Sequence, residues 1–417
     1  MYAVDTDHRV SVVANQMSSN DHPQLRVAVV YHFFAHYRRA IVERLALDPD
    51  RQWTFIGDLR DYASDIAPAQ LSSMVHFQRC RCVRLAGGFM WQRGLLLHLL
   101  VKRYDAVIFL GADRFLATWI AASMLRLLGA RVLFWTHGYT RRPSGAAAVF
   151  RKTFYRLANG LLMYGRWAKT VAIEQGFAPE RVHVIGNSLD FDAQQAALNA
   201  TTFLRAAQVR RDLFGDDVTP VVSCTTRLVA HRRLDMLLRA AGRLLQLGNP
   251  VNIVLVGDGP ERGRLEQLAA ELRVRVAFTG ACYDESRISE ILAATNVVVA
   301  PGMVGLSAMH ALAYGVPVVS QDNPETQMPE FEAIVPGVTG SLFKEGDLDA
   351  LVDAIRPWIQ SSWVDPGVRS ACRDLIRRFW SPEFQFQTIT RAVDGHEADD
   401  VFWLRSPKSP AASRGQV

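Results

Sequence analysis

The sequence has no uninterrupted apolar run long enough to cross a membrane as a helix. Its most apolar region, residues 105–136, is broken by Asp113, Arg114, Arg126 and Arg131, whereas a spanning helix needs about 20 consecutive apolar residues. The amino terminus also lacks the charged and then apolar pattern of a signal peptide. We therefore expect a cytoplasmic protein that meets the inner face of the cell membrane, if at all, by lying on it.

Cysteine is scarce in this chain. The sequence contains five cysteines, an odd number, and the pair Cys80-x-Cys82 has no second pair nearby to complete a zinc site. Aspartate-x-aspartate strings occur, but none follows a strand that would face the ligand site predicted below. We therefore expect reduced structural thiols, no metal ion and no cofactor.

The positive charge is unevenly distributed. Residues 1–200 contain 24 Lys+Arg and 15 Asp+Glu, whereas residues 201–417 contain 23 and 26. A basic half-molecule favours an anionic partner such as phospholipid or a phosphorylated acceptor, although solvated helix faces would give the same composition. Because no DNA- or RNA-binding motif accompanies the charge, we expect no nucleic acid partner.

Length and patterning predict two domains. The 417 residues exceed the usual limit of one hydrophobic core. Short β-branched runs alternate with amphipathic helical stretches, which is typical of parallel α/β sheets. We therefore expect an α/β fold in which two Rossmann-like, doubly wound domains face each other across a cleft. The expected divisions are a tail at 1–24, the first domain at 25–190, a linker at 191–215, the second domain at 216–375, a helix at 376–395 that crosses back to the first domain, and a tail at 396–417.

Two arginines follow a predicted strand of the second domain. Arg227 comes just after the strand at 220–225, and Arg232 precedes the next helix. Cations at the amino-terminal end of a helix oppose its dipole unless an anion lies between them. Guanidinium groups in this position would neutralise a departing diphosphate and donate bidentate hydrogen bonds to it. The alternative is a pair of surface arginines.

The segment 296–320 combines a buried strand, a Pro-Gly pair and a helix whose first turn has small residues. Free backbone amides at the start of that helix would point at an anion with no side chain in the way. Ordinary α/β packing would give the same pattern. The candidate ligand-binding residues in this segment are Gly302, Val304, Gly305, Leu306 and His310.

The segment 254–265, VLVGDGPERGRL, has the form of a nucleotide-binding turn. Its third glycine, Gly263, is one position too late for a dinucleotide fingerprint, and no acidic residue closes the following strand. A hydride-transfer enzyme is therefore disfavoured. Gly257 remains a candidate because it allows the backbone to turn tightly beside a ligand.

In the first domain, polar side chains follow two predicted strands. His36, Tyr37 and Arg38 come after the first strand, and His137 and Gly138 follow the strand at 131–135. A lone histidine is more often structural, but one at the cleft-facing end of a strand can act on a ligand. We predict that His137 orients the substrate and that the other four residues shape the acceptor side.

Together these motifs resemble the retaining GT-B glycosyltransferases of family GT4 over roughly residues 26–395. The family's V-I-x-N-S-L-D signature is similar to residues 184–190, its R-L-x-x-x-K motif to residues 227–232 with Arg232 in place of lysine, and its V-G-D-G-P turn to residues 256–260. The F-x-G and A-x-G-x-P-V-V strings are matched at 278–280 and 313–319. The resemblance implies a nucleoside-diphosphate sugar as donor and no metal requirement.

One departure from the family pattern concerns the donor sugar. The two carboxylates of the family's E-x7-E pair would fall at Gly302 and His310, so both are missing. The sequence resembles instead a branch with P-G-x-V-G-L-x-A-x-H in that loop, followed by M-P-E-F-E-A-I. We expect His310 to take over a ribose contact, and Glu330, together with Glu325, to bind sugar hydroxyls.

The predicted reaction moves a sugar from a nucleoside diphosphate to an acceptor hydroxyl, with retention, in polysaccharide or glycoconjugate biosynthesis. Arg227, Arg232 and His137 are the predicted catalytic residues, and the acceptor is a saccharide or a lipid-linked molecule. The alternatives are a GT-B epimerase or phosphorylase and a binding subunit without catalysis. Residues 79–103, which mix arginines with Phe89, Trp91 and leucines, also suit contact with an anionic membrane.

Overall fold

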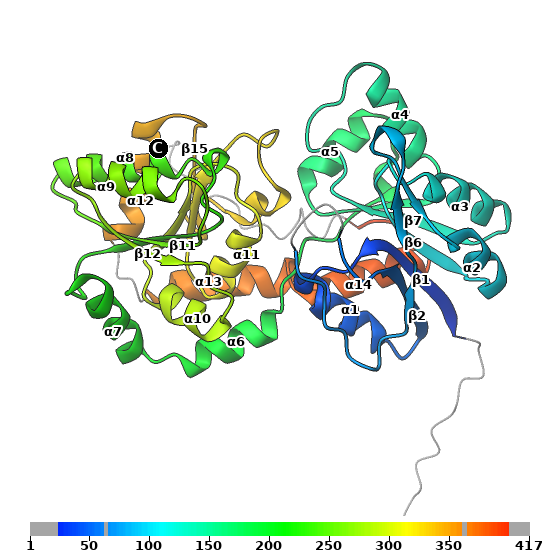
Figure 1. Ribbon diagram of the computed structural model, residues 1–417, viewed down its shortest axis with the longest axis horizontal. Coiled ribbons are helices and arrows are strands. Elements are labelled where there is room, and N and C mark those ends of the chain that lie inside the picture. The colour runs from blue at the N-terminus through cyan, green and yellow to red at the C-terminus, as the bar shows by residue number, and fades with distance from the viewer. Residues whose placement is uncertain (1–23, 62–65, 361–364, 400–417) are drawn as a thin grey trace, which may run out of the picture.

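A computed structural model describes residues 24–61, 66–360 and 365–399. The tails predicted at 1–24 and 396–417 therefore lie almost wholly outside the described residues. Within the described part, two α/β units lie side by side (Figure 1), and each is built on one large parallel sheet. The predicted fold class, two Rossmann-like domains, is confirmed.

The first domain has a seven-stranded sheet in the order β3-β2-β1-β6-β7-β8-β9, and all its pairings are parallel. Helices cover both faces of such a sheet, which is why its strands read as apolar runs rather than as alternating patterns. The strands are β1 Leu25–Phe33, β2 Arg51–Asp58, β3 Phe77–Arg79, β6 Ala106–Leu110, β7 Arg131–Thr136, β8 Gly160–Met163 and β9 Val182–Val184.

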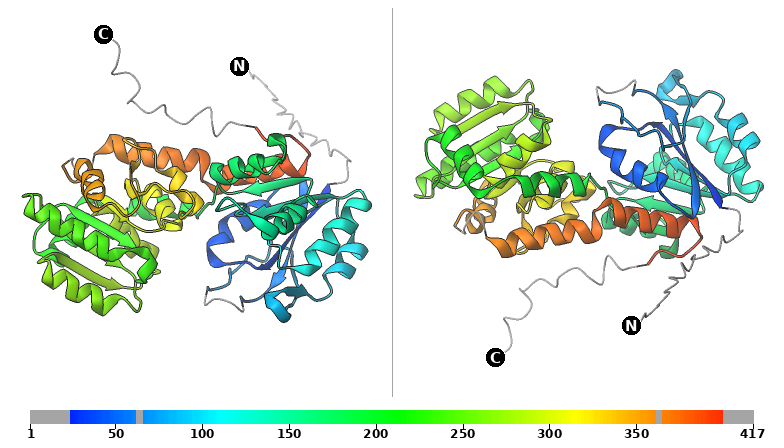
Figure 2. Two further views of the ribbon diagram at one scale, coloured as in Figure 1. Left: turned by 90° about the horizontal axis from the view of Figure 1, so that it is seen from above. Right: turned by 90° about the horizontal axis from the view of Figure 1, so that it is seen from below.

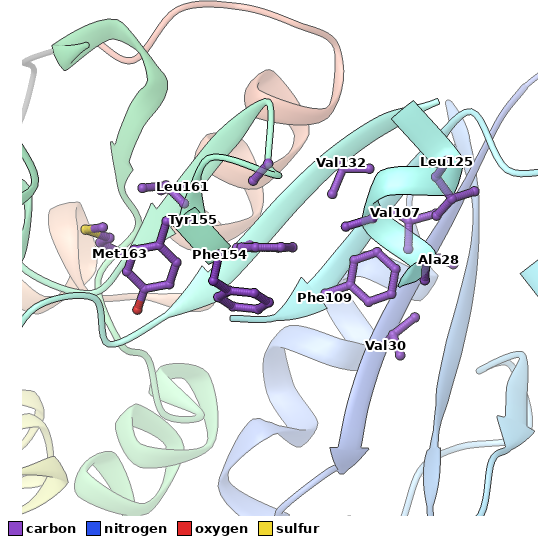
Figure 3. Packing of buried hydrophobic residues seen from close by; sticks show 14 of the residues in the cluster. Ala28, Val30, Val107, Phe109, Leu125, Val132, Phe154, Tyr155, Leu161 and Met163 are labelled. Atoms are coloured by element: carbon purple, nitrogen blue, oxygen red, sulfur yellow. The ribbon is translucent and has the colours of Figure 1, made fainter. Parts of the chain in front are cut away.

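The helices of the first domain bury their apolar faces against this sheet. Phe109 of β6 and Phe154 of α4 belong to the core on one of its faces, which is drawn in Figure 3. The first domain also has an antiparallel strand pair, β4 Cys82–Arg84 with β5 Met90–Gln92. The sequence pattern did not predict this pair. The helices are α1 Arg39–Ala46, α2 Leu95–Lys102, α3 Leu116–Leu127, α4 Gly145–Tyr155 and α5 Arg166–Glu174, with 3-10 turns η1 His36–Arg38, η2 Ala86–Gly88 and η3 Pro179–Arg181.

The second domain repeats the plan with six parallel strands in the order β12-β11-β10-β13-β14-β15. The strands are β10 Val221–Thr225, β11 Asn252–Val256, β12 Arg275–Gly280, β13 Val297–Ala300, β14 Val318–Gln321 and β15 Gly340–Phe343. The helices are α8 Leu234–Gln246, α9 Arg262–Glu271, α10 Glu285–Ala293, α11 Leu306–Ala313 and α12 Leu348–Gln360, with 3-10 turns η4 Ala230–Arg232 and η5 Pro329–Ala333.

Four further helices connect the domains. The predicted linker at 191–215 consists of α6 Phe191–Ala200 and α7 Phe203–Phe214, and the carboxy-terminal segment consists of α13 Pro366–Phe379 and α14 Pro382–Val393. α13 packs on α11 in the second domain and α14 on α1 in the first, so the chain returns to the domain in which it began (Figure 2). At the crossing, the backbone of Gly186 passes so near that a Cβ there would lie 2.8 Å from the carbonyl oxygen of Phe379.

All five cysteines are free thiols. Among the described residues, the structure has no helix that combines the length and the apolar character needed to cross a membrane.

Candidate functional site

The carboxyl ends of the two sheets meet where the domains meet. From the first domain come the segments after β7 and β8; from the second comes the segment after β14, which ends in η5. A small pocket between them is lined by His137, Tyr139, Gly165 and Trp167 on one side and by Gln327, Met328, Pro329 and Glu332 on the other. The candidate site therefore lies between the two sheets, where the fold class predicts ligands to bind.

Arg232 lies against the loop that is predicted to bind the donor. Its Nη1 donates a hydrogen bond of 2.5 Å to the carbonyl oxygen of Met303, and its Nε is buried with no hydrogen-bond partner in the described structure. The two backbones also touch, because a Cβ at Gly302 would lie 2.4 Å from the carbonyl oxygen of His231. A side chain at position 302 would therefore clash with the backbone of the 231–232 turn. The hydrogen bond to Met303 also holds the Arg232 guanidinium, whose Nε has no partner in the described structure, beside the 302–306 loop.

The amides at the start of α11 do not all stay free. The Val304 amide donates a hydrogen bond of 2.7 Å to Oε1 of Gln327, whose side chain is buried. The expectation of three free amides at 304–306 is therefore wrong for Val304, because a side chain from the next loop satisfies it. Gly305 and Leu306 begin the helix, and no hydrogen bond engages their amides elsewhere in the described residues.

The other second-domain candidates have different surroundings. Arg227 is exposed, and its side chain has no hydrogen bond or ion pair within the part of the chain that the structure describes. Gly257 has a φ of +147°, and its amide donates to the carbonyl of Gly280 at 2.8 Å. A Cβ at this position would lie 1.9 Å from the carbonyl oxygen of Thr226. Backbone packing between β10 and β11 thus accounts for this glycine without a ligand.

Arg38 sits in a cage of aromatic rings on the first domain. Its guanidinium donates a hydrogen bond to the Tyr164 hydroxyl and lies 4.9 Å from the ring centroid of Tyr31 and 5.1 Å from that of Trp135. Cations are stabilised over aromatic faces, most strongly where water is excluded. This arginine is therefore a fixed positive charge on the first-domain wall of the candidate site.

His137 lies beside this cage. Its ring centroid is 4.7 Å from that of Tyr164. Although the side chain is solvent-accessible, protein surrounds it on several sides, and this desolvation together with the Arg38 charge lowers the pKa of His137 to about 4. The imidazole is therefore neutral at neutral pH and can both donate and accept a hydrogen bond.

The remaining first-domain candidates serve the geometry of the cleft. Gly138 has a φ of +68°, in the left-handed region that favours glycine, and a Cβ there would lie 2.8 Å from the sulfur of Met163. His36 is exposed, and Tyr37 packs against the core of the second domain. The structure thus brings His36, Tyr37 and Arg38 to the domain junction.

His310 faces the interdomain helix α6. Its Nδ1 lies 3.4 Å from Nε2 of Gln194 and 3.8 Å from a carboxylate oxygen of Glu285. Burial lowers the pKa of His310, with Glu285 acting in the opposite direction and His36 acting in the same one. The imidazole is half-buried and lies in the last turn of α11. This arrangement does not test the predicted ribose contact.

Glu330 is buried against the first domain instead of lining an open cleft. Its side chain is 1% exposed, and Oε1 accepts a hydrogen bond of 2.6 Å from Nδ2 of Asn187. Oε2 has no partner in the described structure, and desolvation raises the pKa of the carboxyl above its usual range. The predicted contact of Glu330 with sugar hydroxyls is not tested by this arrangement. The carboxylate of Glu325 lies 3.5 Å from Arg142 of the first domain.

Four residues of the candidate site were not predicted from the sequence. Gln327 and Glu332 lie in the same short segment as the predicted glutamates. Tyr164 directly follows β8, and Asn187 lies three residues after the end of β9. The position after a strand was the available signal for the last two. Gln327 and Glu332 gave no such signal, because their partners lie more than twenty and more than one hundred and sixty residues away.

The candidate site combines guanidinium groups with a neutral imidazole, a set of groups that could bind an anion. Arg232 and Arg227 belong to the second domain, and Arg38 with neutral His137 to the first. No group of three or more His, Cys, Asp or Glu side chains that could hold a metal ion occurs in the described residues. A developing negative charge could thus be met here by guanidinium groups and backbone amides.

Comparison with known proteins finds a family match in the second domain. Residues 219–361 match the model of the family described as glycosyl transferases group 1. The chain is 28% identical over 197 residues to a GDP-mannose-dependent monoacylated alpha-(1-6)-phosphatidylinositol monomannoside mannosyltransferase of Corynebacterium glutamicum, an alignment that covers 44% of this chain and 49% of that protein. It is 32% identical over 166 residues, 38% of this chain and 42% of the relative, to a GDP-mannose-dependent alpha-(1-6)-phosphatidylinositol dimannoside mannosyltransferase of Mycobacterium tuberculosis. The chain thus spans about half the length of these curated relatives.

Solved structures extend the likeness to both domains. A glycosyltransferase from Rickettsia africae superposes with a TM-score of 0.68 at 12% identity, covering 89% of this chain and 98% of that one. Anabaena Alr3699/HepE in complex with UDP superposes with a TM-score of 0.66 at 17% identity, covering 89% and 99%. These identities show the fold alone. Residues 219–361 therefore match the glycosyl transferases group 1 family, and the chain has a two-domain GT-B fold.

Proposed function

We propose that this protein is a glycosyltransferase that moves a sugar from a nucleoside-diphosphate sugar to the hydroxyl of an acceptor. The observation that carries the proposal is the attachment of Arg232 to the 302–306 loop, through its 2.5 Å hydrogen bond to Met303. Departure of a nucleoside diphosphate concentrates negative charge, and a cation held in place before the reaction stabilises it without reorganisation. Arg227 and the amides of Gly305 and Leu306 complete this proposed diphosphate site.

The base and the sugar of the donor are the first things to measure. The curated relatives named above depend on GDP-mannose, whereas Alr3699/HepE was solved with UDP. Thermal shift with GDP, UDP, dTDP and CMP, followed by their sugars, distinguishes these donors because a ligand stabilises the folded form by mass action. Transfer is then assayed with the donor that binds. Absence of stabilisation by every nucleotide would contradict the proposal.

The acceptor and the stereochemistry are proposed from the family resemblance. We expect transfer with retention to a saccharide or lipid-linked acceptor in polysaccharide or glycoconjugate assembly, without a metal ion or cofactor. The Arg38 cage and neutral His137 support an acceptor wall that orients hydroxyl groups. NMR of the product gives the anomeric configuration, and activity that survives EDTA supports the absence of a metal requirement.

Two alternatives share the fold. A nucleotide-sugar epimerase would change the donor without an acceptor, and a binding subunit would retain the donor without transfer or hydrolysis. The second alternative has a specific observation in its favour, because Gly302 and His310 replace both carboxylates of the family pattern. Product analysis with and without acceptors separates the three outcomes.

The first domain also carries a surface suited to an anionic membrane. On α2, the side chains of Leu97 and Val101 are 67% and 68% exposed. Lys102 and Arg103 follow them, and neither has an ion pair among the described residues. Beside them lies a hollow of about 370 Å³, lined by Arg79, Arg93, Leu97, Val101 and Lys102 among others. Of these cations, Arg79 is paired with Asp58 at 3.3 Å. Apolar groups beside cations such as Lys102 fit the interface of a bilayer.

Co-sedimentation with vesicles of phosphatidylcholine and phosphatidylglycerol tests this surface. Replacing Leu97 and Val101 with serine should weaken binding, and raising the salt concentration should weaken it further, because screening acts on the cationic contribution. Leu204→Ser is the matched control, since Leu204 is 74% exposed on α7, in the segment that connects the domains. Equal vesicle binding by the wild type, the variant with serine at 97 and 101, and the Leu204→Ser control would overturn the membrane proposal.

A further inference from the structure

A carboxylate of the second domain caps a helix of the first. The Oε2 and Oε1 atoms of Glu332 accept hydrogen bonds of 2.6 Å and 2.7 Å from the backbone amides of Arg166 and Trp167. These amides open helix α5. The Glu332 side chain is 5% exposed and also lies 3.3 Å from the Arg166 guanidinium. The first-turn amides of a helix lack partners within the helix and carry partial positive charge, so a carboxylate there satisfies both requirements.

Helix α5 has no cap of its own. Its N-cap residue is Gly165, which has no side chain to accept from the first turn. The glycine also gives Glu332 room, because a Cβ on Gly165 would lie 2.8 Å from Oε1 and 3.1 Å from Cβ of Pro329. The backbone of Gly165 is extended, with a φ of −136°, so this position would accept other residues were it not for the contact with η5.

The capping glutamate belongs to a segment that contacts both domains. We call residues 325–332 the strap. At one end, the Glu325 carbonyl accepts a hydrogen bond of 3.1 Å from Nε of Arg141, in the first domain. On η5, Glu330 accepts a hydrogen bond from Asn187, three residues after the end of β9. The strap thus holds the first domain at three places.

In its middle, the strap holds the loop proposed to bind the donor. Gln327 accepts from the Val304 amide at 2.7 Å, and its Nε2 donates to Oγ of Ser320 at 2.8 Å and to the carbonyl of Gln321 at 2.9 Å. One buried side chain thereby joins the start of α11 to the end of β14. Any movement of the strap must be transmitted to the 302–306 loop or break these bonds.

We infer that Glu332 is a positioning residue that couples the placement of the first domain to the shape of the 302–306 loop. Its cap is formed while the domains are in the observed arrangement, and Gln327 transfers that arrangement to the backbone at Val304. The coupling is a property of the folded chain. Its consequence for catalysis rests on the proposed function: the cap should favour the step in which donor and acceptor react more than it favours donor binding.

Amide hydrogen exchange tests the coupling without any ligand. In Glu332→Gln, one backbone amide of α5 faces an NH₂ group instead of an oxygen, so exchange at residues 166–167 should rise roughly fivefold to tenfold, as expected for loss of a helix cap. If the strap transmits the change, exchange at Val304 should rise as well. Glu43→Gln is the matched control, because Glu43 lies on α1 of the same domain and pairs with Arg39 on that helix at 3.0 Å.

A second variant reaches the same contact without altering the charge. Gly165→Ala leaves Glu332 in place but displaces its carboxylate. Its effect on the two exchange rates should resemble that of Glu332→Gln, and the double variant should be no worse than either single one, since coupled residues are non-additive. Additive effects, or exchange at Val304 that stays at the wild-type rate in both variants, would overturn the inference.

Nucleotide binding separates this inference from the proposed function. If GDP or UDP binds, Glu332→Gln should lower kcat severalfold while the nucleotide dissociation constant changes by less than twofold. If a nucleotide binds but Glu332→Gln changes neither kcat nor the exchange rate at Val304, the coupling is contradicted and the donor site is not. If no nucleotide binds, the proposed function fails, while the exchange experiment still decides whether the strap couples the two regions.

Discussion

Nη1 of Arg232 lies 2.5 Å from the carbonyl oxygen of Met303, so the guanidinium is part of the loop that begins α11. The Gly302 amide returns a hydrogen bond of 3.2 Å to the carbonyl of Arg232. These two bonds join the 3-10 turn after β10 to the loop after β13, and the two strands are neighbours in the sheet. The joined segments form the surface that we propose binds the diphosphate. The positive charge is held in place by the backbone before any ligand arrives.

Arg232→Ala should abolish useful turnover while leaving the fold intact. Loss of one preorganised donor at a site of developing charge costs on the order of 10²–10³ in kcat. Arg232→Lys should recover only part of the rate, because an ammonium group cannot bond Met303 and a phosphate in the planar, forked geometry of a guanidinium. The measurement is steady-state kinetics, with circular dichroism to verify the fold.

Arg239→Ala is the control for this prediction, because Arg239 is exposed on α8 of the same domain. It should retain wild-type kinetics. An Arg232→Ala enzyme within about twofold of wild type would remove Arg232 from the catalytic residues.

His137 should act as a neutral imidazole across the physiological range. Desolvation and the Arg38 charge lower the pKa of His137 to about 4, so the ring gains a proton only as the pH falls toward that value. The ratio of wild-type to His137→Asn activity should therefore be constant between about pH 6 and pH 8. A ratio that changes with a midpoint near 6.5, the usual pKa of histidine, would show that the ring titrates normally.

The sequence predicted the elements well where burial on both faces leaves a plain signal. Apart from Asp105 and Asn252, the runs 105–110 and 251–256 are apolar, because parallel strands lie between two layers of helices. Strands β6 and β11 formed there. The segment 191–215 reads as a linker with a helical lead-in, because its strand–helix alternation stops. The structure forms α6 and α7 from it. Their stability comes from packing on α10, which no local pattern reveals.

Site residues were predictable where position along a strand determines them. His137 and Arg232 follow strands, and the sheet brings the ends of its strands together. The partner of the Val304 amide was not predictable, since Gln327 is a polar residue in a loop whose path depends on the first domain. The same holds for Glu332 and the amide of Trp167, which meet only after both domains have folded and docked.

Glu330→Gln should change how stability depends on pH. Desolvation raises the pKa of the Glu330 carboxyl in the folded protein. The folded state thus holds this proton at pH values where the unfolded chain has released it, and wild-type stability falls as the pH rises above the usual range of glutamate. Glutamine keeps the acceptor for Asn187 and removes the titration. The Tm of Glu330→Gln relative to wild type should therefore increase from pH 5 to pH 8.

Glu383→Gln supplies a control of opposite sign. The hydrogen bond from Arg44 lowers the pKa of Glu383, so its ionised form stabilises the fold above the usual glutamate range and that stabilisation is lost in acid. The Tm of Glu383→Gln relative to wild type should not increase with pH. If the Tm difference for Glu330→Gln is the same at both pH values, burial has not shifted the carboxyl in the way that the structure indicates.

Gly257, just after β11, and Gly263, in the following helix α9, test the effects of backbone packing and of helix propensity separately. Gly257→Ala would place a Cβ 1.9 Å from the carbonyl oxygen of Thr226, at a φ of +147°, so the substitution should lower the free energy of unfolding by about 3 kcal/mol or more. Gly263 lies in the first turn of α9, where a Cβ would meet no neighbouring atom within 4 Å. Gly263→Ala should therefore be neutral or stabilise the protein by up to about 1 kcal/mol. Urea unfolding of both variants gives the comparison. Equal unfolding midpoints would show that the backbone at Gly257 can move to accommodate a Cβ, against the close contact in the structure.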